Sequence, residues 1–460
     1  MNTAAPYYFL GIGGIGMSAL ARYFNQMGHL VFGYDKTPSE LTDKLQSEGI
    51  TITFEDAVSS LPQEIIEKKG DAQIVYTPAI PKDHVQYNWL LANGFMAKKR
   101  SVVLGEISTN TFNIAVAGTH GKTSTSCMIA HLLNTAGIPF SAFLGGVSAD
   151  LGSNYFNSGK TKEGIQITVT EADEFDRSFL TLSPDISIIT STDADHLDIY
   201  GRAEEVKKSF YDFAHRLEKD GTLYHAFGLH DDLPKDINRI SYGIDKGSIH
   251  AEQVRFENGK FLFDLYIDNT VFRYVNLAVP GWHNVENAVV AAAVAHQLGA
   301  SEDDIKKGLS TFKGVKRRFE YIKNDEQGIF IDDYAHHPTE LNAIISSVKR
   351  MYPDKKITGI FQPHLYSRTR DFVDGFAASL DLLDEAILMP IYPARELPIA
   401  GVESDMILEK MQNKHAIVCG REGLIARLSQ SKVEVLLTLG AGDIDREIGK
   451  LKIWMNEANK

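Results

Sequence analysis

Residues 112–124 read FNIAVAGTHGKTS, an apolar run that leads into a loop ending in the sequence GKTS. The run from Asn113 to Ala117 predicts a buried strand, and the residues after the loop predict a helix through Leu133. The order of strand, glycine-containing loop and helix is that of a phosphate-binding P-loop. The strict P-loop pattern has glycine where this chain has Val116, and Gly118 stands in its place. The segment therefore predicts a variant P-loop in an α/β domain.

The chemistry of this loop points to a nucleoside triphosphate. Backbone amides of the loop would surround the phosphates, Lys122 would reach the β- and γ-phosphates, and Thr123 would face Mg²⁺. A lysine at a helix N-terminus is electrostatically unfavourable unless an anion lies there, which argues against a plain strand–helix turn. The predicted ATP-binding residues of the loop are Gly118, Thr119, His120, Gly121, Lys122, Thr123 and Ser124.

Acidic residues follow the next two predicted strands, 165–170 and 186–190. Glu171 comes directly after the first, which is where a metal–phosphate centre beside a P-loop has a carboxylate. The sequence DADHLD at 193–198 follows the second and includes His196. Because Mg²⁺ prefers oxygen ligands, this pattern leaves a second ion site and a solvated acidic turn both open.

A second glycine-rich loop, GIGGIG at 11–16, lies between a predicted strand at 7–10 and a predicted helix at 17–27. Asp35 ends the strand that follows, as in the dinucleotide-binding fingerprint. Such a loop recognises a pyrophosphate and not a nicotinamide, so NAD and another nucleotide diphosphate are both compatible with it. The predicted contacts are Gly11, Gly13, Gly14, Ile15, Gly16 and Asp35.

Two further regions carry polar side chains at predicted element ends. Asn284 and Asn287 open a helix and share a face, where their amides could read an adenine edge or simply cap the helix. The segments 332–338 and 362–370 each close a buried strand, and arginines precede the first of them. Arginine binds carboxylate or phosphate bidentately, and strand-end loops are where open α/β sheets bind ligands, although each residue taken alone could be a surface ion pair.

Strands alternating with helices predict three Rossmann-like α/β units in series, with antiparallel hairpins near 248–279. We expect domains at 1–106, 107–314 and 315–460. The formal net charge of −13 argues against a protein that holds nucleic acid through its overall field. No apolar stretch of membrane-spanning length and no signal peptide is evident, and two cysteines make no disulfide framework, so we expect a cytoplasmic protein without membrane insertion.

Eight segments occur in an order that resembles the Mur ligases of peptidoglycan synthesis, over essentially the whole chain. They are GIGGIGMSA, AGTHGKTSTS, EADEFDRSFL, TDADHLDIYG, GWHNVENAVVA, KGVKRRFE, DDYAHHPTE and QPHLYSRTRD. The last two most resemble the members that join L-alanine to UDP-N-acetylmuramate. The resemblance implies a UDP-sugar-binding domain, an ATP-binding domain and an amino-acid-binding domain, ATP and Mg²⁺ (or Mn²⁺) as cofactors, and a monomer or homodimer.

The resemblance also implies roles for individual residues. The loop at 11–16 would hold the UDP pyrophosphate and not NAD, Lys122 would be catalytic, and Glu171 and His196 would be catalytic metal ligands beside Thr123. ATP would be held by Asn284, Asn287, Arg318 and Asp333, and the amino acid and acyl centre by Tyr334, His336, Arg368 and Arg370.

This chain departs from the family pattern at two places. Many relatives have arginine where it has Leu365, so a carboxylate contact is absent or is supplied elsewhere, such as by Arg370. Relatives often carry a histidine near the segment at 52–55, which leaves the uridine contacts around Thr53 and Phe54 undefined. No lysine is evident where some sister ligases carry a carbamylated one.

The activity that the resemblance implies is phosphorylation of the lactyl carboxylate by ATP, followed by attack of the L-alanine amine on the acyl phosphate. Three alternatives stay open. A related recycling ligase adds a tripeptide to the same UDP-sugar. An NAD-dependent dehydrogenase would use the loop at 11–16 and Asp35 but would leave the GTHGKT loop and Glu171 unexplained. A non-catalytic regulator would bind ATP without releasing phosphate.

Overall fold

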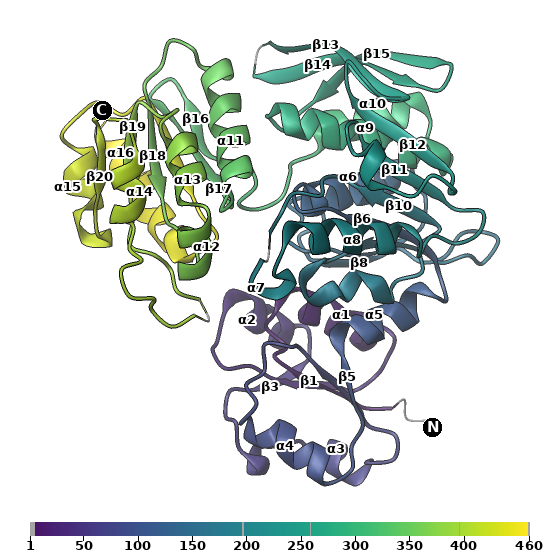
Figure 1. Cartoon of the computed structure of the whole chain (residues 1–460). Coiled ribbons are helices and arrows are strands. Elements are labelled where there is room, and N and C mark those ends of the chain that lie inside the picture. The colour runs from purple at the N-terminus through teal and green to yellow at the C-terminus, as the bar shows by residue number, and fades with distance from the viewer. Residues whose placement is uncertain (1–4, 196, 258, 395, 459–460) are drawn as a thin grey trace. The chain divides into compact units, whose positions relative to one another are not determined.

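The computed structural model describes residues 5–195, 197–257, 259–394 and 396–458. The described residues form three sheets flanked by helices (Figure 1). The chain divides into two compact units. The first comprises Met1–Glu252, Leu265–Phe272 and Asn287–Leu309, and the second comprises Gln253–Asp264, Arg273–Glu286 and Ser310–Lys460.

The N-terminal sheet is parallel, with strand order β3-β2-β1-β4-β5. Its strands are β1 (Tyr7–Leu10), β2 (Val31–Tyr34), β3 (Thr51–Thr53), β4 (Gln73–Tyr76) and β5 (Ala97–Lys99). Its helices are α1 (Ile15–Gln26), α2 (Glu40–Ser47), η1 (Val58–Ser60), α3 (Gln63–Glu67), α4 (Val85–Ala92) and α5 (Arg100–Ser108). Leu10 is in register with Tyr34 and Tyr76, so the loops that follow β1, β2 and β4 share one edge of the sheet.

The central sheet has ten strands in the order β15-β14-β13-β12-β11-β10-β6-β9-β7-β8. Its strands are β6 (Phe112–Ala117), β7 (Ser141–Phe143), β8 (Tyr155–Asn157), β9 (Ile167–Glu171), β10 (Ile186–Ile189), β11 (Thr222–Ala226), β12 (Arg239–Ile244), β13 (Ile249–Glu257), β14 (Lys260–Ile267) and β15 (Thr270–Leu277). The accompanying helices are α6 (Lys122–Thr135), η2 (Phe175–Thr181), α7 (Leu197–Tyr200), α8 (Ala203–Ala214), η3 (His230–Asp232), α9 (Trp282–Gln297) and α10 (Glu302–Thr311). Strand β6 lies between β9 and β10 and is fully buried from Ile114 to Ala117, which explains its unbroken apolar sequence.

The C-terminal sheet has the order β16-β17-β21-β18-β19-β20, with β16 antiparallel to β17 and the other neighbours parallel. Its strands are β16 (Glu320–Asp325), β17 (Gly328–Asp333), β18 (Ile357–Phe361), β19 (Glu385–Leu388), β20 (Ala416–Val418) and β21 (Val435–Leu439). Its helices are α11 (Pro338–Met351), α12 (Tyr366–Asp371), α13 (Val373–Leu380), α14 (Asp405–Lys410), η4 (Arg421–Gly423), α15 (Leu424–Leu428), η5 (Asp443–Glu447) and α16 (Ile448–Ala458).

The predicted α/β class is confirmed, and the predicted central strands and the helix after the P-loop are present with small shifts of their ends. The short strands β3, β5 and β20 were not predicted. Each has three residues, and β5 reads Ala-Lys-Lys, so backbone pairing rather than an apolar pattern makes it a strand. The turn expected at 258–259 includes Asn258, which lies outside the described residues.

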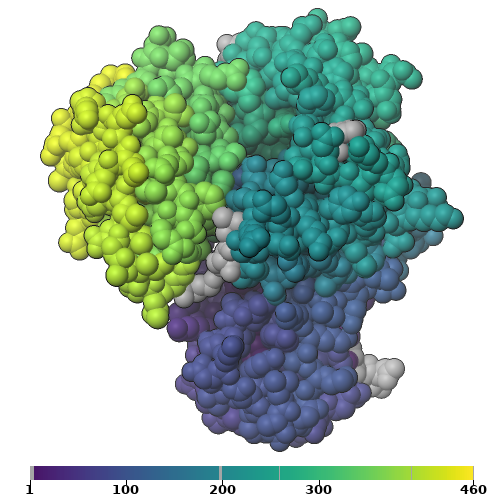
Figure 2. Space-filling model, in the orientation of Figure 1, coloured from purple at the N-terminus to yellow at the C-terminus, as the bar shows by residue number. Residues whose placement is uncertain are grey.

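The N-terminal sheet and the β6–β11 part of the central sheet belong to the first compact unit, and their surfaces adjoin in Figure 2. The contacts include an ion pair between Arg100 and Asp173 and a hydrogen bond from Thr181 Oγ1 to the Ser101 carbonyl of 2.8 Å. None of the helices in the described ranges combines the length and the apolar character needed to cross a bilayer.

Candidate active site

The loop between β6 and α6 is shaped by two glycines in left-handed backbone conformations. Gly118 has φ 136° and Gly121 has φ 83°. A Cβ atom at Gly118 would lie 2.0 Å from Thr190 Oγ1, so only glycine fits there. Helix α6 begins directly after this turn, and the backbone amides of its first turn can bind an anion.

The ammonium of Lys122 lies over the mouth of this loop. Its Nζ donates to the Gly118 carbonyl at 2.6 Å and pairs with both oxygens of Glu174, at 2.9 and 2.8 Å. Glu174 is only 2% exposed, and burial raises its pKa to about 7 although the lysine favours its ionised form. Burial lowers the pKa of Lys122, but Glu174 together with Glu171 and Asp173 outweighs this and raises it. The lysine therefore stays a cation at the place where phosphates are expected.

Candidate oxygen ligands for a metal lie at the same edge of the sheet. Glu171 ends β9 and is in register with Val116 of β6, two residues before the loop begins. Its Oε2 accepts a hydrogen bond from the Gly145 amide at 3.1 Å, and a Cβ at Gly145 would lie 2.1 Å from Oε1. Thr123, which is buried, contributes a hydroxyl from the first turn of α6.

His196, the third predicted metal ligand, lies outside the described residues. Among the residues that are described, no three His, Cys, Asp or Glu side chains gather as a protein-only metal cage. Mg²⁺ is commonly held by one or two carboxylates together with substrate phosphates and water. Glu171 and the Thr123 hydroxyl are hard oxygen donors and fit that kind of site.

The side chains of Thr119 and His120 brace the loop. Thr119 Oγ1 donates to the Asp193 carbonyl at 2.7 Å, and His120 Nε2 lies 3.3 Å from the Asp193 carboxylate. The His120 amide donates to Ser191 Oγ at 2.8 Å. Asp193, in the acidic segment after β10, therefore stabilises the conformation of the loop.

Asn287 reaches the loop from α9. A Cβ at Gly121 would lie 3.0 Å from Asn287 Oδ1, and Asn287 is buried. Asn284, one turn earlier on the same helix, is also buried and donates from Nδ2 to the Pro280 carbonyl at 2.6 Å. Ser124 is half-buried in the first turn of α6.

The loop at 11–16 starts with Gly11 in a left-handed conformation, φ 84°, and leads into α1 at Ile15. The Gly13 amide donates to Asp35 Oδ2 at 2.7 Å. The carboxylate of Asp35 thus fixes the shape of the loop itself. Gly14 is the N-cap of α1, and a Cβ at Gly16 would lie 2.7 Å from Arg100 Nη1.

Arg100 is a candidate site residue that the sequence analysis missed. It lies beside Gly16, and its Nη2 is 3.3 Å from Asp173 Oδ2, so it links the loop at 11–16 with the acidic turn after β9. It is also the first residue of α5. A cation at a helix N-terminus is unfavourable without an anion nearby, and this signal could have identified it.

In the second compact unit, Asp333 organises the turn after β17. Its oxygens accept hydrogen bonds from the Phe319 amide at 2.7 Å and the Ala335 amide at 2.8 Å. Burial raises the pKa of Asp333 to about 6, although Arg318 favours the ionised form. The Arg318 guanidinium lies 4.9 Å from the centre of the Tyr334 ring. Three predicted residues are therefore brought together.

His336 and Arg368 extend this group. His336 Nδ1 lies 3.0 Å from the Tyr334 carbonyl and 3.2 Å from Glu340 Oε2. The His336 and His364 rings are 6.1 Å apart, and buried Arg368 has Nη1 3.5 Å from His364 Nδ1. His364 is thus a further member of the group, from the strand-end loop after β18.

Arg370 and Leu365 lie differently from the other predicted residues. Arg370 is exposed, and its Nε donates to the neighbouring Asp371 at 2.7 Å. Leu365 is buried with φ 71°, and its amide donates to the Tyr392 carbonyl at 3.0 Å. The position therefore holds an apolar side chain in the interior rather than an anion contact.

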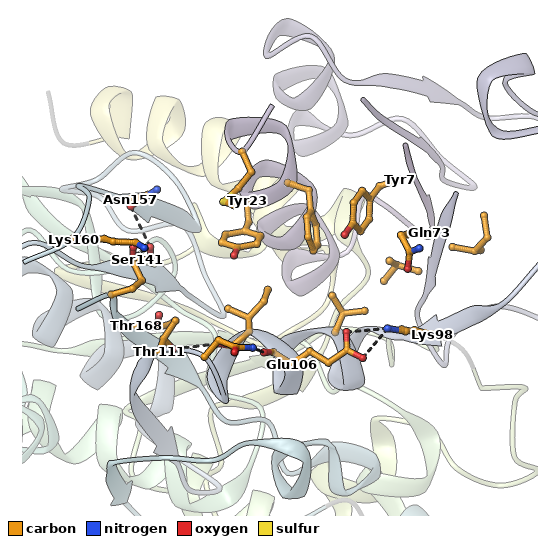
Figure 3. A pocket seen from close by; sticks show the side chains of 18 residues that line it. Tyr7, Tyr23, Gln73, Lys98, Glu106, Thr111, Ser141, Asn157, Lys160 and Thr168 are labelled. Carbon is orange, nitrogen blue, oxygen red and sulfur yellow. Dashed lines mark hydrogen bonds and ion pairs between the residues drawn. The ribbon is translucent and has the colours of Figure 1, made fainter. Parts of the chain in front are cut away.

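A cavity of about 350 Å³ lies elsewhere, between the N-terminal and central sheets (Figure 3). Gln73 and Ser141, which line it, are the first residues of β4 and β7. Lys98 and Glu106 form an ion pair of 2.7 Å at its wall. The cavity therefore opens at the amino ends of strands, opposite the edge that carries Lys122 and Glu171.

Comparison with known proteins identifies the family. Residues 6–111 match the profile described as "Mur ligase family, catalytic domain", 116–295 the "Mur ligase middle domain", and 317–442 the "Mur ligase, glutamate ligase domain". The chain is 45% identical over 453 residues to a UDP-N-acetylmuramate--L-alanine ligase of Christiangramia forsetii, covering 98% of both chains. It is 46% identical to the same-named protein of Parabacteroides distasonis, over 98% of this chain and 97% of that one.

A solved structure agrees with these matches. The UDP-N-acetylmuramate-alanine ligase of Thermotoga maritima superposes with a TM-score of 0.80 at 27% identity, over 99% of this chain and all of that chain. The resemblance inferred from eight short segments is thereby confirmed over the whole length. This chain belongs to the Mur ligase family.

Proposed function

We propose that this chain is an ATP-dependent ligase that joins L-alanine to the lactyl carboxylate of UDP-N-acetylmuramate in peptidoglycan precursor synthesis. The observation that carries the proposal is the match, at 43–46% identity and over nearly the full length, to relatives named for this reaction. A P-loop lysine that is paired with a buried carboxylate supports the use of ATP.

The reaction needs activation because a carboxylate and an amine do not condense spontaneously in water. A lactyl carboxylate oxygen attacks the γ-phosphorus of ATP, the bond to the β-phosphate oxygen breaks, and ADP leaves. The neutral α-amine of L-alanine then attacks the acyl carbon, phosphate departs with the former carboxylate oxygen, and the amine gives up one proton. The new bond is an amide.

The first compact unit supplies the groups for phosphoryl transfer. Lys122 donates to the β- and γ-phosphates and offsets the charge that gathers on the transferring group. The amides behind Gly118 and Gly121 bind the phosphate oxygens, and Asn287 holds the nucleotide beside them. Glu171 and Thr123 would hold Mg²⁺, with His196 as a further ligand. When bound, Mg²⁺ neutralises phosphate charge and orients the oxygens for in-line attack.

The same unit carries the proposed UDP-sugar site. The loop at 11–16 holds the pyrophosphate, and Asp35 keeps this loop in shape through the Gly13 amide. Arg100, between this loop and Asp173, is placed to bind an anionic group of the same substrate. Two anions have to approach each other in this reaction, and a cation between the loop at 11–16 and the acidic turn after β9 lowers their repulsion.

The second compact unit carries the proposed contacts to the rest of the nucleotide and to the amino acid. Asn284, Arg318 and Asp333 contribute to ATP binding. Tyr334, His336 and Arg368 surround the amino acid, with the Arg368 guanidinium as the partner for its carboxylate. Arg370 is exposed and paired with Asp371, and we assign it a peripheral role.

The test is a phosphate-release assay with UDP-N-acetylmuramate, ATP and Mg²⁺ across a panel of amino acids, followed by mass spectrometry of the product. We expect phosphate release that requires all three substrates and is fastest with L-alanine, with glycine and L-serine as comparisons. A product with the mass of UDP-N-acetylmuramoyl-L-alanine completes the result. Release of phosphate that does not respond to any amino acid would refute the proposal.

The same assay separates the alternatives. Preference for a tripeptide over L-alanine in direct competition would identify the recycling ligase. Quenching of protein fluorescence by NADH, with no ADP formed from the ligase substrates, would identify a dehydrogenase. ATP binding without phosphate release under every condition would identify a regulator.

A further inference from the structure

Two hydrogen bonds fix the backbone carbonyl of Glu174. The Tyr200 hydroxyl donates to the Glu174 carbonyl at 2.5 Å, and the Arg177 amide donates to the same oxygen at 2.9 Å. Asp176 and Arg177 have left-handed conformations with φ 52° and 54°. Such conformations are unfavourable for non-glycine residues, and they persist only where the surroundings impose them.

With its backbone fixed, Glu174 places its carboxylate against the Lys122 ammonium. Glu174 is 2% exposed, and Tyr200 is also buried. The Lys122 Nζ has three N–H donors, and its neighbours are both Glu174 oxygens, the Gly118 carbonyl at 2.6 Å and the Thr119 carbonyl at 3.3 Å. Every donor is therefore engaged before any phosphate arrives, and at least one contact has to be exchanged when ATP binds.

We propose that Glu174 is a positioning residue of the ATP site, whose carboxylate holds the Lys122 ammonium at the mouth of the loop until a phosphate takes over one of its donors. The proposal rests on the proposed function only in taking a nucleoside triphosphate as the ligand. It differs from the role of Glu171, which lies three residues earlier and is assigned to the metal.

The pair makes a prediction that a merely structural residue does not. With Lys122 present, Glu174→Gln removes the partner that aligns the ammonium, so the nucleotide binds more weakly. With Lys122→Met, no ammonium is left to align, and the buried Glu174 side chain takes up a proton. In that background Glu174→Gln replaces one neutral side chain by another, so nucleotide binding should hardly change.

The experiment is a double-mutant cycle on the full chain, with AMP-PNP and Mg²⁺ titrated by calorimetry. We expect Glu174→Gln to raise the Kd of AMP-PNP about tenfold in the wild-type background, the effect of one charge-assisted contact. We expect Lys122→Met to raise it by more, and Glu174→Gln to cause no further increase in the Lys122→Met background. An equal weakening by Glu174→Gln in both backgrounds would overturn the proposal, because Glu174 would then act independently of the lysine.

If the Lys122→Met variant does not fold, the steady-state kinetics of a conservative variant of Glu174 test the proposal instead. Glu174→Asp retains the charge but shortens the side chain, so its kcat should lie between those of the wild type and Glu174→Gln, with the KM for UDP-N-acetylmuramate unchanged. Wild-type kcat and KM for ATP in Glu174→Gln would refute the positioning role.

Failure of the two proposals can be told apart in the wild-type protein. If the wild type does not bind AMP-PNP, the proposed function is wrong. If it binds AMP-PNP and ligates L-alanine but Glu174→Gln weakens binding equally in both backgrounds, only the role of Glu174 is wrong.

Discussion

Replacement of Lys122 by Met should destabilise the nucleotide-free chain in a way that depends on pH. Methionine fills the space of the lysine stem but leaves the Glu174 carboxylate, 2% exposed, without its ammonium. Loss of this counter-ion favours the protonated form of the buried carboxyl, so the variant raises the pKa of Glu174 beyond the value of about 7 that it has beside the lysine.

The direction in which stability changes with pH follows from proton linkage. Glu174 has a higher pKa in the folded than in the unfolded chain, so the folded state holds a proton that the unfolded state releases, and stability falls as pH rises toward the folded pKa. Below about pH 6 Glu174 is protonated in both proteins, and the variant avoids the desolvation of an ammonium, so we expect little or no penalty. Above pH 7 only the wild type gains the ion pair, and the penalty grows by about 1.4 kcal/mol per pH unit.

Urea unfolding of both proteins at about pH 6 and pH 8.5 measures this difference. We expect the destabilisation caused by Lys122→Met to be about 2 kcal/mol larger at the higher pH. A penalty of equal size at both values would show that Lys122 and Glu174 are not coupled in the way that their 2.8 Å separation implies.

Three further changes test other parts of the site. Glu171→Ala should lower kcat by about 100-fold or more and raise the Mg²⁺ concentration needed for half-maximal rate, because a carboxylate ligand is lost; an unchanged metal titration would contradict the assignment. Gly145→Ala should shift the metal titration in the same direction, since its Cβ would lie 2.1 Å from Glu171 Oε1, whereas Gly70→Ala, which meets no atom within 4 Å, should change nothing. The stability of Asp333→Asn relative to the wild type should be lowest at acid pH. Burial raises the pKa of Asp333 from 3.8 to about 6, so the stability of the wild type falls as the pH rises from 4 to 7. In urea melts the free energy of unfolding of the variant, relative to that of the wild type, should therefore increase by up to about 3 kcal/mol over this rise in pH. A difference between Asp333→Asn and wild type that stays constant with pH would refute this pKa.

Much of the architecture could be predicted because the central strands of the sheets are short, largely apolar runs. The residues 114–117 and 357–361 are buried throughout, and their sequences show it. The positions of the P-loop and Glu171 could also be predicted. Both follow buried strands directly, and the loops at the carboxyl ends of parallel strands meet at one edge of the sheet. The short edge strand at 97–99 could not be predicted, because it forms through backbone pairing and carries two lysines.

The missed parts of the site depend on contacts between distant segments. Glu174 contacts Lys122 from a turn in which Asp176 and Arg177 adopt left-handed conformations, and no glycine in the sequence predicts such a turn. Arg100 lies beside both Gly16 and Asp173, 73 residues further along the chain. The resemblance placed both Arg368 and Arg370 at the amino-acid and acyl centre, but in α12 Arg368 is buried and Arg370 is exposed to solvent.

The central claim is that the lactyl carboxylate becomes an acyl phosphate, and an oxygen label tests it most directly. UDP-N-acetylmuramate carrying ¹⁸O in both carboxylate oxygens is incubated with ATP, Mg²⁺, L-alanine and the enzyme, and the released phosphate is analysed by mass spectrometry. The account predicts one ¹⁸O atom in each phosphate and one in the amide of the product. Unlabelled phosphate formed together with the ligated product would contradict it.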